Sequence, residues 1–144
     1  MAFQTVIFTL DKEEYAFRVD GVQEITRLAE IHPLPSAPDY IRGLINIRGQ
    51  AIPLINLHTR LGLNRSQETE YAIISKLDQG VVAFAVEEVK EIKTIEDISP
   101  PPLFGNTTVI EGIVNLNDRM IIQLNPKTIL EQQDIENISE LLKQ

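Results

Sequence analysis

The sequence IRGLINIRGQAIPLINL, residues 41–57, predicts a β-hairpin. Apolar residues fill both of its arms, and Arg48-Gly49 stands between them, where glycine suits the positive φ of a tight turn. The turn explains Gly49 but leaves Arg48 without a role. This arginine could be a solvated turn residue that pairs with a local acid such as Glu24, or it could orient a partner through its forked donors and flat face.

The rest of the chain also predicts β-structure. Apolar and β-branched runs are separated by short polar segments such as DKEE (11–14) and DQG (78–80), which are typical of hairpin turns. Prolines at 33, 35 and 38 and at 100–102 indicate two extended connectors. The expected strands are residues 3–10, 15–19, 22–28, the two arms that flank Arg48-Gly49, 71–77, 81–86, 89–95, 110–116 and 120–124.

Helix is expected in three short places only. Residues 58–63 predict a single helical turn that Gly62 ends. Residues 126–133 begin with a proline after an asparagine, which suits a helix start. Apolar residues at 135, 138, 141 and 142 have helical spacing and predict a short C-terminal helix.

An internal repeat underlies this pattern. YAFRVDGVQEI (15–25) and VAFAVEEVKEI (82–92) share Ala-Phe-x-Val-x-x-Val-x-Glu-Ile, and IRGLINI (41–47) matches IEGIVNL (110–116). The match includes Glu24/Glu91, Gly43/Gly112 and Asn46/Asn115. The glycines are expected to permit a bulge or a close backbone approach, and the asparagines to bond nearby backbone.

The repeat predicts an all-β protein made of two similar five-stranded barrels. Closing a short antiparallel sheet into a barrel removes its exposed edges. The expected division is residues 1–66 and 67–132, followed by a tail at 133–144. The alternative is a chance likeness between apolar strands.

The two copies differ at the turn. The first has Arg48-Gly49-Gln50-Ala51, whereas the second has Asn117-Asp118-Arg119. A barrel of this kind is therefore expected to close its hairpin without an arginine at that place, which makes Arg48 a candidate for a function.

Composition limits the class of protein. The chain has 144 residues, no cysteine and a formal net charge of −8 at pH 7, and aromatic residues make up 6%. Thiol catalysis and zinc–thiolate sites are thereby excluded, and binding to nucleic acid or anionic lipid is disfavoured. No signal peptide and no long apolar run are recognised. A soluble cytoplasmic protein with protein or small-molecule partners is expected.

No catalytic, metal-binding or cofactor-binding motif stands out. The only histidines are His32, in a proline connector, and His58, at the start of the short helical turn. Neither has the neighbours of a metal site, no serine lies in a nucleophile elbow, and GLINIRG lacks the spacing of a phosphate loop. We therefore expect no enzyme and no cofactor. An oligonucleotide-binding small barrel is the alternative from another class.

The residues also resemble a known family. YIRGLINIRGQAIPLINLHTRLGL (40–63) resembles the signature of CheW-type chemotaxis adaptor domains, with its Gly-x-x-Asn-x-Arg-Gly-x-x-x-Pro core. YAFRVDGVQEI resembles the first strand pair of these domains, and PPPLFGNTTVIEGIVNLNDRMIIQLNPKTIL (100–130) resembles their C-terminal portion. The resemblance covers about residues 3–132. It implies a single domain of two intertwined five-stranded SH3-like barrels.

The resemblance further implies a non-enzymatic scaffold of chemotaxis signal transduction. Such an adaptor links the cytoplasmic tip of methyl-accepting chemoreceptors to the regulatory domain of a CheA-type histidine kinase. It lies in the cytoplasm, reaches membrane-associated receptor arrays through its partners, binds no nucleic acid and does not insert into the membrane. The same adaptor role in pilus-driven motility or another chemosensory-like pathway is the alternative.

The resemblance assigns candidate binding residues, and no catalytic residue or metal ligand. A groove for the receptor tip is expected to use Val22, Glu24, Gly43, Arg48, Val89 and Ile92. Ala51, on the strand after the turn, is expected to face the kinase.

Two residues depart from the family pattern. Arg18 stands where an acid is common, and Asn56 stands where an aspartate is common before the leucine. Either change could alter charge matching with a particular receptor or kinase.

Overall fold

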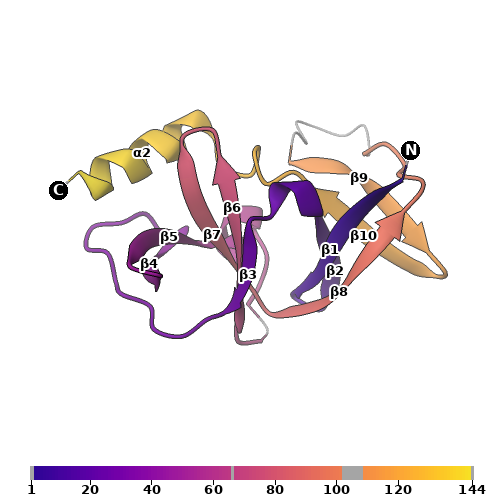
Figure 1. The fold of residues 1–144 in the computed structure, drawn as a ribbon, viewed down its shortest axis with the longest axis horizontal. Coiled ribbons are helices and arrows are strands. Elements are labelled where there is room, and N and C mark those ends of the chain that lie inside the picture. Colours follow the sequence, from indigo (N-terminus) through magenta and orange to yellow (C-terminus); the bar gives the residue numbers. More distant parts are fainter. Residues whose placement is uncertain (1, 66, 102–108, 144) are drawn as a thin grey trace.

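The computed structural model describes residues 2–65, 67–101 and 109–143 (Figure 1). In these residues ten strands form two five-stranded sheets, accompanied by a 3-10 turn at Val19–Gly21 and two α-helices, α1 and α2. The elements are β1 Phe3–Leu10, β2 Glu13–Arg18, β3 Glu24–Arg27, β4 Ile41–Ile47, β5 Gln50–Asn56, α1 Leu57–Leu61, β6 Tyr71–Leu77, β7 Gly80–Val86, β8 Glu88–Ile95, β9 Ile110–Leu116, β10 Arg119–Leu124 and α2 Gln132–Leu142. The expected all-β class with a short C-terminal helix is confirmed.

The two sheets have the same internal order. Barrel A runs β8-β1-β2-β10-β9, and barrel B runs β3-β6-β7-β5-β4. Adding five to each strand number of barrel A, and counting on from β1 after β10, gives the strand order of barrel B. Barrel A lies on the right of Figure 1 and barrel B on the left. The internal repeat therefore has a direct structural counterpart.

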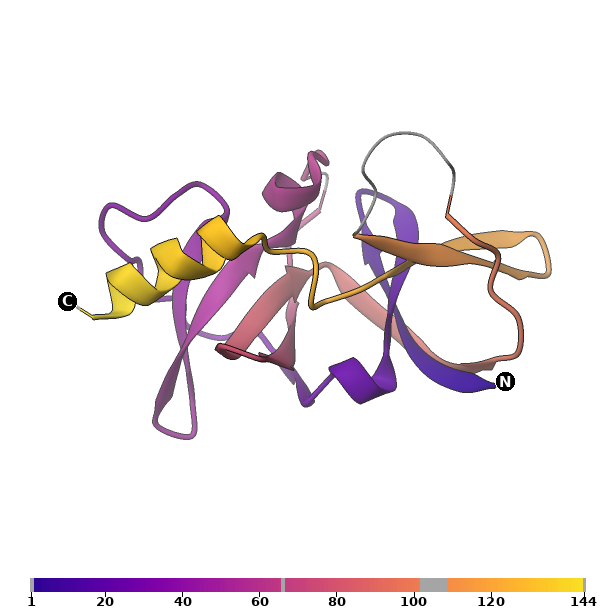
Figure 2. The ribbon, with the colours of Figure 1, turned by 90° about the horizontal axis from the view of Figure 1, so that it is seen from above.

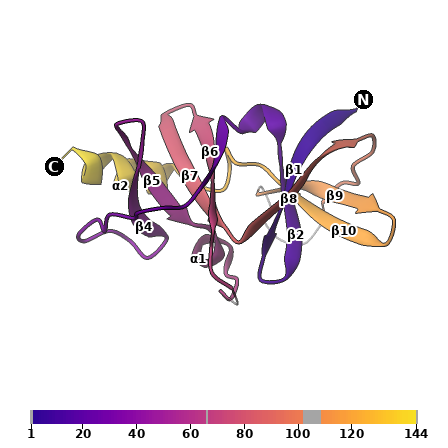
Figure 3. The same ribbon diagram turned by 60° about the horizontal axis from the view of Figure 1, so that its bottom comes forward.

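The expected division of the barrels at residue 66 is wrong. Barrel A takes its strands from residues 3–18 and 88–124, and barrel B takes all of its strands from residues 24–86. Each half of the sequence thus gives its first hairpin to one barrel and its last three strands to the other, which is the intertwined arrangement. Figure 3 shows the chain crossing between the barrels as it enters β3 and again as it enters β8. A repeat shows which strands are equivalent, but not which copy each strand pairs with.

Both barrels close in the same way. The chain after β3 forms a bridge from His32 to Leu44 of β4, and the chain after β8 forms a bridge from Ser99 to Ile113 of β9. A Cβ on Gly43 would collide with the carbonyl oxygen of His32, and one on Gly112 would lie 2.5 Å from that of Ser99. The predicted close backbone approach at these glycines is confirmed, and it explains why the repeat keeps both.

The main core lies between the barrels. Phe8 and Phe17 of barrel A have ring centroids 4.9 Å apart, and Phe17 lies 5.4 Å from Phe84 of barrel B. Each barrel adds a small interior cluster, around Ile52 and Ile74 in barrel B and around Ile7 and Ile121 in barrel A. The barrels therefore share their largest cluster of buried side chains.

The helices differ in part from expectation. The short turn at α1 ends at Gly62 in the left-handed conformation, as predicted. The helix expected from residue 126 is wrong: Asn125 accepts a hydrogen bond from the Lys127 amide, which makes a turn there, and α2 starts only at Gln132. α2 then runs along barrel B to the C-terminal end of the described chain (Figure 2). Neither helix has the length and apolar character needed to cross a membrane.

We expect Gly43→Ala to destabilise the protein by about 1–3 kcal/mol, because the new methyl group would strike the His32 carbonyl and φ at this position is +149°. Chemical denaturation would measure the change in the free energy of unfolding. Gln50→Ala at the exposed start of β5 is the control. Equal stability of the two variants would contradict the close approach.

Candidate partner-binding site

Arg48 forms an ion pair between the two edge strands of barrel B, β3 and β4. It stands at the tip of the β4–β5 hairpin and donates from Nη1 to Glu24 Oε2 at 3.0 Å and from Nη2 to Oε1 at 2.5 Å. Because Glu24 lies on β3, at the opposite edge of the sheet from β4, the pair links the two edges. The sequence-based suggestion that Arg48 pairs with Glu24 is confirmed.

The pair is open to solvent, since 71% of the Arg48 side chain is exposed. The hydrogen bond from Arg48 lowers the pKa of Glu24, and the bond to Glu24 raises the pKa of Arg48. Exposed ion pairs contribute little to stability because water and salt screen them. The pair therefore fixes the direction of an exposed guanidinium more than it stabilises the fold.

Barrel A has a similar pair, which the sequence did not reveal. Arg119 donates to Glu14 at 2.6 and 3.1 Å and to Glu91 at 3.1 Å. Glu91 is the repeat equivalent of Glu24, and the β9–β10 turn itself is made by Asn117 and Asp118, so this hairpin closes without an arginine at the place of Arg48, as expected. The arginine has moved to the start of the next strand. Its hydrogen bond to Glu14 is the main cause of the lowered pKa of that carboxyl and of its own raised pKa.

Asn46, which both copies of the repeat hairpin share, supports the turn. Asn46 Oδ1 accepts a hydrogen bond from the Gly49 amide at 2.8 Å, as its predicted backbone-bonding role requires. This bond holds the turn in which Arg48 itself has a φ of +51°. Arg48 is therefore positioned by two contacts, the Asn46–Gly49 bond within the hairpin and the ion pair of its side chain with Glu24 on β3.

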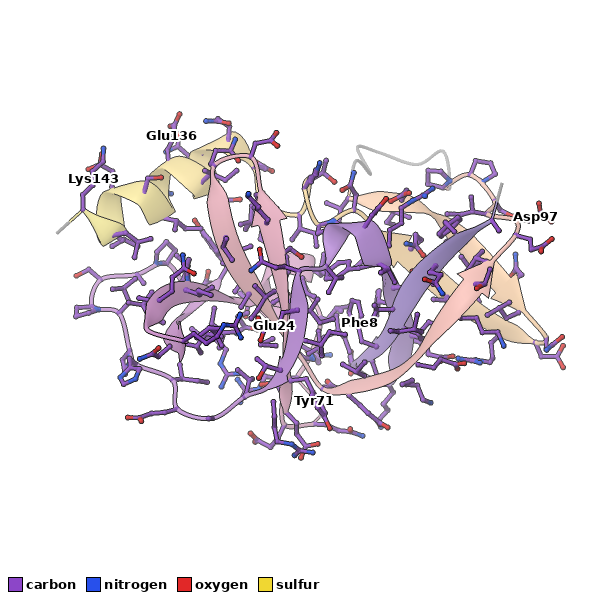
Figure 4. All side chains as sticks on the ribbon, in the orientation of Figure 1. Phe8, Glu24, Tyr71, Asp97, Glu136 and Lys143 are labelled. Carbon is purple, nitrogen blue, oxygen red and sulfur yellow. The ribbon has the colours of Figure 1, made fainter. Side chains whose placement is uncertain are left out.

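The remaining candidate groove residues have different environments. Val22 and Val89 are both partly buried and pack against the core that the barrels share. They stand beside the two crossovers, Val22 just before β3 and Val89 near the start of β8. Figure 4 labels Glu24 on β3, in this middle region of the molecule. Ile92 is 57% exposed on β8.

Gly43 is placed differently from the other candidates. It is buried against the backbone of His32, so it offers no exposed surface. Its position in the hairpin is explained by the closing of barrel B. The structure thus brings Glu24 and Arg48 into direct contact, and it gives Gly43 an architectural role.

Ala51 lies on another face of barrel B. It is exposed on β5 and lines a hollow of about 220 Å³ between the β4–β5 hairpin, the β6–β7 hairpin and α2. Ile135, Ile138 and Leu142 of α2 form part of its wall. The contribution of α2 to this face was not predicted. The spacing of apolar residues predicted that the helix forms, but not which part of the barrels it packs against.

A buried polar pair ties the barrels together, and sequence reasoning missed it. His58 Nε2 lies 2.6 Å from Glu87 Oε2, and both side chains are at least 98% buried. Glu87 stands between β7 of barrel B and β8 of barrel A, and its Oε2 also accepts from the Asp11 amide in barrel A. No local pattern marks this pair, because His58 and Glu87 lie far apart in sequence.

The two departures from the family pattern have local partners. Arg18 Nε donates to Glu111 at 2.6 Å, and its guanidinium lies 4.0 Å from the centre of the Phe3 ring. Asn56 accepts from the Thr59 amide and so caps α1. Both side chains therefore serve the fold of this chain.

Two fused barrels, each with an arginine–glutamate ion pair that is exposed at Arg48 and partly buried at Arg119, define a binding module. Among the described residues, no group of three or more His, Cys, Asp or Glu side chains is arranged to hold a metal ion. Residues 4–134 match the family of CheW-like domains. The chain therefore belongs to the CheW-like family of chemotaxis adaptors.

Similar proteins agree with this family. The chemotaxis protein CheW of Klebsiella aerogenes is 30% identical over 146 residues, which cover 96% of this chain and 87% of that protein. The chemotaxis protein CheW of Treponema pallidum is 27% identical over 150 residues, which cover 96% and 88%. The crystal structure of the scaffolding protein TtCheW from Thermoanaerobacter tengcongensis matches with a TM-score of 0.85 at 30% identity, covering 93% of this chain and 91% of that one. The expected fold of two SH3-like barrels is thus confirmed.

We expect His58→Ala to lower the free energy of unfolding by about 1–3 kcal/mol, because it removes one of two hydrogen-bond partners of the buried Glu87 carboxyl group. Chemical denaturation measures the loss. His32→Ala, at a histidine whose side chain is 54% exposed, is the matched control and should change little. A similar small effect in both variants would show that the His58–Glu87 pair does not tie the barrels.

We expect the stability advantage of the wild type over Arg119→Gln to decrease in acid. The pKa of Glu14 is lowered from 4.5 by Arg119, so the stabilisation is complete above about pH 4.5 and is lost as the pH falls through the lower pKa of the folded protein. Denaturant titrations between pH 3 and pH 7 measure the difference. A difference that stays constant over this range would contradict the role of the ion pair.

Proposed function

We propose that this protein is a non-enzymatic adaptor that couples the cytoplasmic tips of chemoreceptors to a CheA-type histidine kinase. The observation that carries the proposal is the match of residues 4–134 to the CheW-like family, on a fold with both barrels complete. The protein acts in the cytoplasm and joins membrane-associated arrays through its partners. Its formal charge of −8 argues against the oligonucleotide-binding alternative.

The receptor tip is proposed to bind where the barrels meet. Val22 and Val89 supply apolar surface beside the two crossovers, and Ile92 supplies an exposed apolar side chain on β8. Arg48 lies at the edge, where Glu24 holds its guanidinium. Two bonds to Glu24 use only part of the five N–H donors of a guanidinium, so others can bond a receptor backbone or carboxylate. Gly43 supports this surface indirectly, by closing the barrel that carries Arg48.

The kinase regulatory domain is proposed to bind by barrel-to-barrel contact, with Ala51 in the contact. The support is its exposed place on β5, beside the hollow lined by α2. Each contact can be weak, because an array makes later contacts intramolecular and raises their effective concentration. The signal is then a shift in how the kinase is held, and this chain performs no chemistry.

The same adaptor role in pilus-driven motility remains the second candidate. The two departures that raised it, Arg18 and Asn56, have partners within the chain, so they do not favour either pathway. A deletion strain separates the two pathways: flagellar chemotaxis predicts loss of directed swimming, and the alternative predicts loss of surface motility.

We expect Arg48→Ala to fold normally and to bind the kinase regulatory domain as the wild type does, while its binding to a receptor tip becomes roughly 10- to 100-fold weaker. Removal of an exposed interface arginine affects the partner far more than the fold. Calorimetric titration with each partner measures the affinities, and Lys76→Ala, at an exposed residue of β6, is the control.

Two results would contradict parts of this proposal. A large fall in melting temperature of Arg48→Ala would give the residue a structural role instead. If the wild-type protein gives no binding heat with the regulatory domain of a CheA-type kinase from the same organism, the adaptor proposal fails.

A further inference from the structure

α2 fills a groove on barrel B. Ile138 is buried in the core that the barrels share, and Ile135 packs against it. Both residues line the same hollow as Pro53 and Val82 of barrel B. Polar contacts at the N-terminal end of the helix hold it in place: Arg60 Nη2 lies 3.2 Å from Asp134 Oδ2, and Tyr40 Oη donates to the Asp134 carbonyl at 3.5 Å.

The internal repeat gives the same groove on barrel A. The parallel pairing of Leu54 with Ala83 in barrel B corresponds to that of Gln123 with Ala16 in barrel A, which fixes the equivalence of the strands. The backbone amide of Asn56 donates to the Tyr40 carbonyl, and that of Asn125 donates to the Val109 carbonyl. These bonds extend the equivalence to the residues before β4 and β9. The positions Tyr40, Ile41, Pro53, Ile55 and Val82 thus correspond to Val109, Ile110, Ile122, Leu124 and Tyr15.

On barrel A these five side chains line an open hollow of about 240 Å³. Leu61, at the end of α1, completes one wall. Among the described residues, no helix equivalent to α2 packs in this hollow, because the chain after β5 and α1 continues into β6 at Tyr71, whereas the chain after β10 continues into α2.

We propose that this hollow on barrel A is a docking site for an amphipathic helix of a partner protein, seated as α2 is seated on barrel B. It is lined by β2, β9, β10 and the end of α1, so it is separate from the β3 and β8 residues of the proposed receptor groove. The inference does not depend on the proposed receptor and kinase contacts.

Charge defines the kind of helix that fits. Tyr40, which bonds the Asp134 carbonyl on barrel B, corresponds to Val109 on barrel A, and Val109 lines the hollow. The groove on barrel A therefore offers hydrocarbon where α2 meets a hydroxyl, and none of the described residues that line it is a cation that could pair with a carboxylate at the position of Asp134. Its partner helix has apolar residues at the spacing of Ile135 and Ile138, with an uncharged residue in place of Asp134.

A peptide made from α2 itself is the probe. It comprises residues 131–143 with Asp134→Asn, and a side-chain staple between its outer positions 136 and 140 keeps it helical, since isolated short helices are marginal. Added to the full-length ¹⁵N-labelled protein, it should shift the amide signals of Ile110 and Ile122 in a saturable way. The matched control peptide carries Ile135→Ser and Ile138→Ser and should shift none.

Protein variants locate the site. Ile122→Asp should abolish the shifts, whereas Ile92→Asp, at an exposed position on the same barrel, should keep them. Leu63→Ser, at another residue that lines the hollow, gives an independent test and should weaken binding at least 10-fold. The kinase titration, repeated with Ile122→Asp, separates a failure here from a failure of the proposed function.

Three results would overturn the proposal. The first is the absence of peptide-induced shifts in the wild type, and the second is a set of shifts around Ile52 and Gln79, which would mean that the peptide only replaces α2 on barrel B. The third is a concentration-dependent dimer in sedimentation that Ile122→Asp abolishes, which would assign the hollow to a second copy of this chain.

Discussion

The packing of Phe8 and Phe17 against Phe84 is the interaction on which the rest of the structure depends. It joins side chains from both barrels into one core, so each barrel would leave a large apolar face exposed without the other. The crossovers run past this core, and the buried His58–Glu87 pair lies where the second of them begins. A single cooperative unfolding transition is the natural consequence of such sharing. The Arg48–Glu24 pair, in contrast, lies at the surface and takes no part in this core.

Strands and turns could be predicted because they depend on local signals. Alternating apolar residues, DQG and Arg48-Gly49 gave all ten strands to within a few residues. The assignment of strands to barrels could not be predicted, since equivalent strands of a repeat satisfy either pairing equally well. The helix expected from residue 126 was wrong because Asn125 forms a turn with the following backbone, while the capping box of Glu131 and Asp134 starts α2 later.

The candidate site could be predicted only in part, because local sequence signals show some of its contacts and not others. Glu24 was a visible acid for Arg48, and the pair is present. Arg119 was missed because it does not align with Arg48 in the repeat. The two arginines stand at different positions of their hairpins, yet Arg48 pairs with Glu24 and Arg119 pairs with its repeat equivalent, Glu91. The roles of Val22, Val89 and Ile92 in binding stay predictions, since burial and exposure describe a surface but not its partner. Family resemblance supplied the partners, which no side-chain pattern in this chain encodes.

The order in which strands enter the barrels has a consequence for synthesis on the ribosome. All strands of barrel B have emerged once residue 86 leaves the exit tunnel, so this barrel can assemble early. The β1–β2 hairpin, made first of all, must wait for β8, β9 and β10 before its own sheet is complete. During that interval its edges and the faces of Phe8 and Phe17 stay uncovered, a state open to pairing with a neighbouring nascent chain. A protein whose two barrels exchange strands within one polypeptide is thereby most vulnerable before residues 88–124 are made.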